Sequence, residues 1–253
     1  MKNYRITKYN PKNRNNEGHY QLDEWTCPSE KGTFFDGVEF KSDEYFDIES
    51  KYIKAAIKLI ESCNLDHLRV VSLDSNYMEE NFIDPDSQWL LDDEFQAVKL
   101  FEDKSLNILE IETVLKMILR NFMGCSLEVN GELKLHFGYD YYMYASLPLI
   151  EQSTISYIES MGLYCEDLTQ ITPAYSYEYS IDIGRKDQEF VDDTIYLENI
   201  TPDKTRKLLG LSIEHPCNHS FKITPEISSL FKDQIDFDFS KNEYFFSCSK
   251  EFH

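Results

Sequence analysis

Apolar side chains recur every three or four residues in three stretches of the chain, and this period predicts amphipathic helices. In the first stretch, Ser42 is a helix-capping residue type, and the apolar stripe that follows it runs to Cys63. In the second stretch, Ser105 precedes a similar stripe that ends at Gly124. A third helix is predicted over 149–161.

Alternating polar and apolar residues predict antiparallel strands between these helices. The clearest hairpin pairs 126–129 with 132–139 through Asn130-Gly131, a dipeptide that suits a two-residue turn. Asp36-Gly37 predicts a smaller hairpin in the same way. Further strands are expected in the alternating segments 4–9, 67–73, 95–100 and 141–145.

The character of the chain changes at 170–173, which we interpret as a joint between two domains. Beyond it, 175–183 and 190–197 predict a hairpin, and 244–248 predicts a last strand. Thr201-Pro202 and Thr224-Pro225 each predict the start of a helix. We therefore expect an α+β fold in two packed units, each with a mostly antiparallel sheet covered by helices. The predicted boundaries are 1–169 for the N-terminal α+β domain and 173–253 for the small C-terminal α+β domain.

The charge balance narrows the classes of partner. The chain has 253 residues, of which 46 are acidic and 25 are lysine or arginine, giving a net charge of −21. A negative field of this size repels nucleic-acid phosphates and anionic membranes, whereas it attracts cationic partners and speeds their arrival. Hydrophobic residues make up 42% of the chain, so it has enough apolar material for real cores.

Targeting signals and cysteine spacing predict a cytoplasmic protein. The N-terminal segment is polar, without the apolar core of a secretory signal, and no stretch approaches the roughly 18 apolar residues of a membrane span. The six cysteines are scattered without a Cys-x-x-Cys pair, which favours reduced thiols.

An acidic segment in the first half is a candidate docking surface. Residues 79–103 hold nine acids and one base, Lys99, with Trp89 in the middle. Carboxylates could steer a basic partner and the tryptophan could supply desolvated contact area, although a solvated loop has the same composition. The acid spacing does not fit a calcium-binding EF-hand. The candidate partner-binding residues here are Glu79, Glu80, Asp84, Asp86, Trp89, Asp92, Asp93 and Glu94.

A second candidate lies in the tyrosine-rich segment 136–144. It is either an aromatic face of a sheet or a binding edge, with Tyr139, Asp140, Tyr141 and Tyr142 as the residues that would contact a partner. A hydrolase would pair Asp140 with His136. Residues four apart in a strand are about 13 Å from each other, too far for a direct hydrogen bond.

Other catalytic or metal motifs are weak. His215, Cys217 and His219 could hold zinc in principle, but a closed structural site needs four ligands, so a buried cysteine with surface histidines is the alternative. Dinucleotide-binding, Walker, nucleophile-elbow and His-Glu-x-x-His motifs are absent from the sequence. We therefore assign no catalytic residue, no metal and no cofactor.

Two sets of residues carry a family resemblance. Segment 223–248, with Asp236-Phe-Asp238 and Tyr244-Phe-Phe-Ser-Cys248, resembles the end of a small bacterial domain of unknown function. With the upstream hairpin and the 201–211 helix, the resemblance covers 174–250. The first half is similar to uncharacterised bacterial proteins in segments 4–11 (YRITKYNP), 23–26 (DEWT) and 139–144 (YDYYMY).

The proteins that both segments resemble are placed among the immunity proteins of polymorphic toxin and contact-dependent growth inhibition systems. They imply that the protein neutralises a cognate toxin, often a basic nuclease, by tight stoichiometric binding, with the acidic inhibitor imitating phosphate. They imply no particular site residue. The alternatives are a hydrolase that uses acidic residues around Asp140 and a housekeeping acidic interaction or scaffold protein. We expect no nucleic-acid and no membrane partner.

Overall fold

The computed structural model describes residues 1–74, 85–169, 175–186, 191–198, 201–217, 220–225 and 228–252. The chain divides into two compact units, Met1–Thr172 and Pro173–His253. The fold is α+β, as the sequence predicted, with helices packed against antiparallel sheets. Among the described residues, none of the helices has both the length and the apolar composition of a membrane-spanning segment.

The first unit is built on a seven-stranded sheet with the order β5-β4-β6-β7-β8-β1-β9. Every neighbouring pair of these strands is antiparallel. Strand β9 was not predicted. The strands are β1 Lys2–Thr7, β4 His67–Asp74, β5 Ser105–Asn107, β6 Gly124–Val129, β7 Leu133–Phe137, β8 Met143–Leu147 and β9 Tyr164–Asp167.

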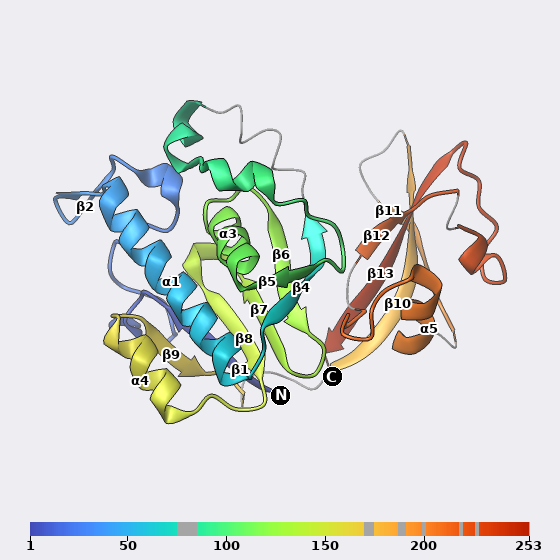
Figure 1. The fold of residues 1–253 in the computed structure, drawn as a ribbon. Coiled ribbons are helices and arrows are strands. Elements are labelled where there is room, and N and C mark those ends of the chain that lie inside the picture. The colour runs from blue at the N-terminus through green and yellow to red at the C-terminus, as the bar shows by residue number, and fades with distance from the viewer. Residues whose placement is uncertain are drawn as a thin grey trace. The chain divides into compact units, whose positions relative to one another are not determined.

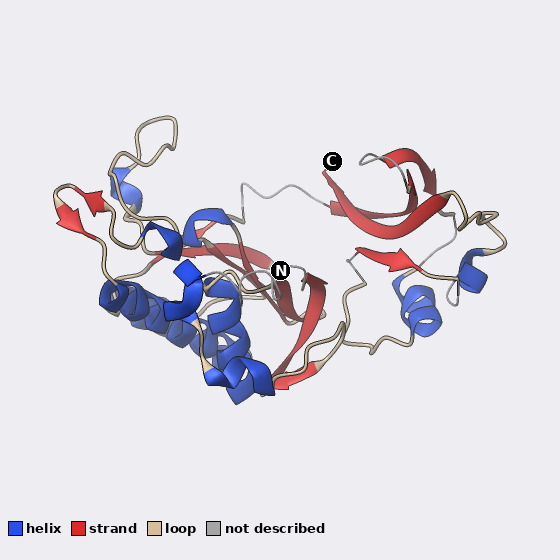
Figure 2. Cartoon of the chain, turned by 90° about the horizontal axis from the view of Figure 1, so that it is seen from above, coloured by secondary structure: helices blue, strands red, loops and turns tan. Residues whose placement is uncertain are grey.

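Three helices, α1 (Ser42–Ser62), α3 (Ile108–Leu119) and α4 (Gln152–Ser160), lie on one side of this sheet (Figures 1 and 2). Their apolar faces and the alternate sheet residues that face them form one core. Burial of this continuous apolar layer is the main force that holds the unit together, and it confirms the predicted helical stripes.

A short hairpin of β2 (Phe34–Phe35) and β3 (Val38–Glu39) lies near the start of α1 (Figure 1). Its turn residues Asp36 and Gly37 have φ values of 48° and 80°. Two successive positive φ values match the twist of a two-residue hairpin, and Asp-Gly tolerates them. The predicted hairpin is therefore confirmed. Before it, the chain forms two 3₁₀ turns, η1 (Pro11–Asn13) and η2 (Pro28–Glu30).

Helix and strand ends differ from the predictions in the first unit. The N-cap of α1 is Lys41, without a side-chain cap, and Ser42 is already helical. The N-cap of α3 is Asn107 rather than Ser105, because Asn107 and Glu110 form a reciprocal capping box. Helix α3 ends at Leu119, and Gly124 begins β6.

The strand predicted over 95–100 is wrong. Residues 95–97 form the end of the 3₁₀ helix η4 (Asp93–Ala97) instead, and another 3₁₀ helix, η3 (Pro85–Leu90), precedes it. The Asp92 side chain accepts a hydrogen bond from the Glu94 backbone N–H, which favours a turn over an extended chain. Phe95 is buried in the core, so its apolar character reflects packing of a turn.

The second unit has a four-stranded antiparallel sheet with the order β11-β10-β13-β12. Thr201 caps α5 (Pro202–Leu209), and Gly210, in the left-handed conformation, ends it as predicted. The helix predicted to begin at Thr224-Pro225 does not appear among the described residues. The 3₁₀ turn η6 (Ser228–Phe231) lies in its place. The strands are β10 Tyr175–Arg185, β11 Val191–Tyr196, β12 Ser220–Ile223 and β13 Asn242–Phe252.

Candidate functional site

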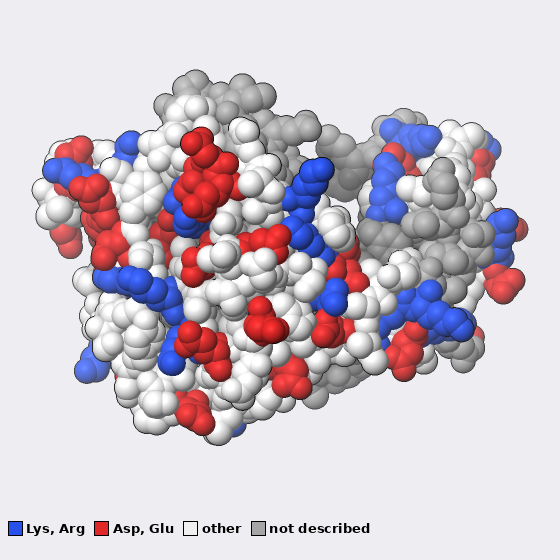
Figure 3. Space-filling view, in the orientation of Figure 1, with Lys and Arg blue, Asp and Glu red and all other residues white. Residues whose placement is uncertain are grey.

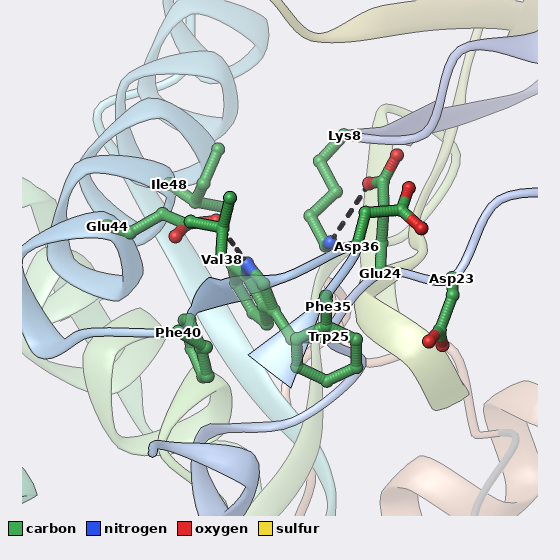
Figure 4. A pocket seen from close by; sticks show the side chains of 10 residues that line it. All are labelled: Lys8, Asp23, Glu24, Trp25, Phe35, Asp36, Val38, Phe40, Glu44 and Ile48. Atoms are coloured by element: carbon green, nitrogen blue, oxygen red, sulfur yellow. Dashed lines mark hydrogen bonds and ion pairs between the residues drawn. The ribbon is translucent and has the colours of Figure 1, made fainter. Parts of the chain in front are cut away.

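The first unit contains a cavity of about 280 Å³ beside the start of α1 (Figure 4). Its walls come from the residue after β1, the segment 23–25, the β2–β3 hairpin and the first turns of α1. Four carboxylates, one amine and an apolar floor meet there. The lining residues are Lys8, Asp23, Glu24, Trp25, Phe35, Asp36, Val38, Phe40, Glu44 and Ile48, which together are called the Lys8 pocket.

Lys8 places its ammonium group against two aromatic rings. Its Nζ atom lies 4.0 Å from the ring centroid of Trp25 and 4.2 Å from that of Tyr9. The same atom is 3.5 Å from Glu24 Oε2, and only 5% of the side chain is exposed. Burial lowers the pKa of Lys8 to about 8, although Glu24 opposes this shift. The amine is therefore partly neutral a little above neutral pH.

Trp25 forms a fixed floor for the pocket. It is buried, and its ring stacks on Phe40 with 4.5 Å between the centroids. Its indole N–H donates a 2.7 Å hydrogen bond to a Glu44 carboxylate oxygen. Figure 4 shows this pair on one side of the pocket and the Lys8–Glu24 pair on the other. Because stacking holds the face of the ring and a hydrogen bond holds its N–H edge, the floor is formed before any ligand arrives.

The mouth of the pocket combines free carboxylates with exposed apolar side chains. Asp23 and Asp36 are exposed, and neither makes a hydrogen bond or ion pair to another residue in the described part of the chain. On the adjoining hairpin, Phe34 is 65% exposed and Val38 is 67% exposed. Apolar area beside unpaired charge is typical of protein-binding surfaces.

In the described part of the acidic segment predicted to bind a partner, Trp89, Asp92 and Glu94 contact other residues of the first unit. Trp89 is half-buried, with its ring 5.4 Å from that of Tyr45, and Lys31 Nζ lies 4.3 Å from its centroid. Lys116 Nζ lies 3.6 Å from an Asp92 oxygen and 3.2 Å from a Glu94 oxygen.

Other residues of this segment are more open or are not described. Asp93 is exposed. Glu79, Glu80 and Asp84 lie outside the described residues, and so does the side chain of Asp86.

A buried ion pair holds this segment in place. Arg120 donates two hydrogen bonds of 2.7 Å to the two carboxylate oxygens of Glu49, and a third to the Leu90 carbonyl oxygen. These contacts connect the end of α3, the middle of α1 and the end of η3. Both charged side chains are less than a tenth exposed.

The tyrosine-rich corner forms the 3₁₀ turn η5 (Tyr139–Tyr141), so β8 begins later than predicted. Asp140 and Tyr141 both have a φ of 59°, an uncommon conformation for non-glycine residues. Tyr141 is buried, and its hydroxyl donates to the Leu119 carbonyl oxygen at 2.5 Å. Tyr142 is half-buried beneath the Arg5 guanidinium.

Asp140 is the exposed carboxylate of this corner and lines a second cavity of about 330 Å³. The side chain of Tyr139 lies outside the description. His136 stacks on Tyr144, and no hydrogen bond joins it to Asp140 among the described residues.

Two of the possible zinc ligands, His215 and Cys217, lie in a local turn. His215 is fully buried, and its Nδ1 atom accepts a 3.0 Å hydrogen bond from the Cys217 backbone N–H. Cys217 Sγ lies 3.5 Å from the Pro202 carbonyl oxygen. The described residues contain no cluster of three potential metal ligands, and His219 lies outside them. His215, which was predicted to lie on the surface, is therefore buried.

Comparisons with protein-family models, with curated proteins and with solved structures found no match. Sequence reasoning missed the Lys8 pocket, since Lys8, Asp23 and Val38 lie apart in the chain. One available signal was the Asp36-Gly37 turn, which placed apolar residues on a hairpin too short to bury them all.

Proposed function

We propose that this protein binds a basic protein partner through its carboxylate-rich surface, and that it acts as an immunity protein for a cognate toxin. The supporting observation is the unequal use of charges in the first unit. Basic side chains are widely engaged: Arg5 and Arg14 both bind Glu166, at 2.9 and 2.5 Å. Exposed carboxylates such as Asp23 and Asp36 have no such partner among the described residues.

This imbalance gives the surface a negative field that suits a cationic partner. Figure 3 shows carboxylates spread over the visible face of the first unit, several of them beside a lysine or arginine. The net charge of −21 opposes binding to nucleic acid, because phosphate would be repelled. A toxin that acts on nucleic acid has a basic surface, and a carboxylate-rich inhibitor can occupy that surface in place of phosphate.

The test is association with the product of a neighbouring toxin-like gene. We expect a stoichiometric complex that abolishes toxin activity. Raising the salt from about 0.05 to about 0.5 M should slow association by about tenfold or more, because the screening length falls well below 10 Å. The dissociation rate, which reports short-range contacts, should change less and serves as the internal control. A complex whose association rate ignores salt would contradict electrostatic recognition.

A further inference from the structure

We infer that the Lys8 pocket and the β2–β3 hairpin form the surface that receives a basic side chain of the protein partner, an arginine or lysine flanked by apolar residues. This inference rests on the proposed function, because it assumes a basic protein partner. It assigns the contact to a particular cavity, hairpin and set of carboxylates.

The charges of the pocket favour a cation. Asp23, Glu24, Asp36 and Glu44 line it, against the single amine of Lys8. Glu24 already contacts that amine at 3.5 Å. Glu44 accepts its hydrogen bond from the neutral Trp25 indole, so its charge is not neutralised. An arriving guanidinium or ammonium group would therefore meet three carboxylates, Asp23, Asp36 and Glu44, that form no ion pair with a described residue of the pocket.

The hairpin supplies what a surface ion pair lacks. An exposed ion pair contributes only about 0–1 kcal/mol, because water screens it. Apolar contacts around the pair exclude water and strengthen the attraction. Phe34 and Val38 are about two-thirds exposed on the hairpin, and Val38 itself lines the pocket. Leucine or a similar side chain on either side of the partner's cation would cover them.

The pocket is also ordered in advance. Trp25 is fixed by its stacking on Phe40 and by its hydrogen bond to Glu44. The hairpin is fixed by its pairing and by the left-handed turn at Asp36 and Gly37. A preformed site needs little ordering when it binds, so more of the contact free energy appears as affinity.

The other large cavity of the first unit is a poorer receptor for a cation. Among the described residues that line it, Asp140 is the one acidic residue and the others are neutral. The side chain of Tyr141 in its wall is buried rather than exposed. Charge complementarity therefore favours the Lys8 pocket.

The experiment uses the full chain and a defined probe. The probe is a fluorescein-labelled peptide in which one arginine lies between two leucines. Its twin carries citrulline, the neutral isostere, in place of that arginine. Binding is followed by anisotropy at about 0.05 M salt. A second readout is the fluorescence of Trp25 in a Trp89→Phe variant, since the chain has only 2 tryptophans.

We expect the arginine peptide to bind about tenfold more tightly than the citrulline peptide and to change Trp25 fluorescence. Asp23→Asn combined with Asp36→Asn should weaken binding by about tenfold, and so should Phe34→Ser combined with Val38→Ser. The matched control, Glu132→Gln combined with Glu151→Gln, removes the same charge from exposed positions outside the pocket and should change affinity less than about twofold.

Two results would overturn the inference. One is equal binding of the two peptides, or no binding of the arginine peptide to the wild-type chain. The other is equal weakening in the pocket variants and in the control, which would indicate a diffuse charge effect. Failure of the proposed function is distinguishable. If a basic toxin binds the wild type and the Asp23/Asp36 variant equally well, the pocket is not the binding surface, but the proposed function still stands. The absence of any salt-dependent basic protein partner removes the function.

Discussion

Lys8 holds an ammonium group between two aromatic rings, where water is largely excluded. The rings attract the cation through their electron-rich faces, but burial removes its hydration. The lowered pKa of this lysine, about 8, indicates that loss of hydration outweighs the attraction of Glu24. Its charged form is therefore less favourable in the folded than in the unfolded chain.

This shift predicts how stability depends on pH. The unfolded lysine has a pKa of 10.5, so protonated Lys8 destabilises the fold below pH 8, and this penalty disappears as the pH rises from about 8 to 10.5. Lys8→Met should therefore be more stable than wild type at pH 7, by about 1–3 kcal/mol, and the difference should vanish near pH 10.5. Urea unfolding at both pH values measures it. If the variant is less stable at pH 7, cation–π attraction outweighs the loss of hydration.

Trp89, which lies within the acidic segment, also contributes to the packing of the first unit, so its substitution would change stability as well as any partner contact. Its ring packs against Tyr45 and Phe46 at the edge of the core. We predict that Trp89→Ala lowers the free energy of unfolding by about 1–3 kcal/mol, because it removes partly buried ring contacts. Denaturant titration measures this change.

The matched variant for the acidic segment is Asp93→Asn, at an exposed position. It should leave stability within about 0.5 kcal/mol of wild type. A change in partner binding in Asp93→Asn would therefore support the predicted docking surface, whereas a loss seen only in Trp89→Ala would reflect stability. Unchanged stability in Trp89→Ala would contradict the packing described for this ring.

Among the elements, α1 and α3 are joined by the buried Glu49–Arg120 pair, which also anchors the end of η3 through the Leu90 carbonyl. A buried pair adds little net stability, since burial removes the hydration of both charges, but removing one partner leaves the other uncompensated. The pair therefore acts mainly to fix how these elements meet.

We predict that Glu49→Gln destabilises the protein by about 3–5 kcal/mol, whereas Glu49→Leu combined with Arg120→Met recovers much of this loss. The control is Asp47→Asn, which removes the exposed Asp47–Lys51 pair and should change stability by less than about 1 kcal/mol. Thermal and urea unfolding measure all three. Equal effects of Glu49→Gln and Asp47→Asn would contradict the description of Glu49–Arg120 as a buried pair whose loss leaves the Arg120 charge uncompensated.

At the scale of the whole molecule, each unit encloses its own apolar core. All six cysteines are free thiols, so the covalent chain adds no cross-link to these cores. In the second unit, Cys217 lies in a turn where its N–H donates to His215 Nδ1 and the His215 carbonyl oxygen accepts from Arg206 Nε. Packing of strands, helices and aromatic side chains is therefore the source of stability in both units.

We predict that reductant together with a metal chelator leaves the melting temperature within about 2 °C of its value without them, because a ligand that stabilised the fold would shift that temperature on removal. Differential scanning calorimetry measures the shift. A fall of many degrees with chelator alone would revive a metal site at His215, Cys217 and His219, and reductant alone separates a redox effect.

The sequence by itself determined most of the local structure of this protein. Hydrophobic period placed α1, α3 and α4, and the Asn130-Gly131 and Asp36-Gly37 turns placed two hairpins, because these signals depend on neighbours in the chain. Thr201-Pro202 and Gly210 placed the ends of α5 for the same reason. The strand predicted over 95–100 was wrong, because the buried Phe95 of this segment packs in the core from a turn. The local sequence pattern does not distinguish such a turn from a strand.

Only the tertiary structure decided the order of the strands and the make-up of the candidate site. Strand β1 lies between β8 and β9, and its pairing with each of them joins residues more than 100 positions apart in the chain. The Lys8 pocket likewise collects side chains from the residue after β1, a loop, a hairpin and a helix, and the lowered pKa of Lys8 follows from burial of its amine. Such properties depend on which surfaces exclude water, and that is settled when the elements pack, because burial is a property of the assembled fold.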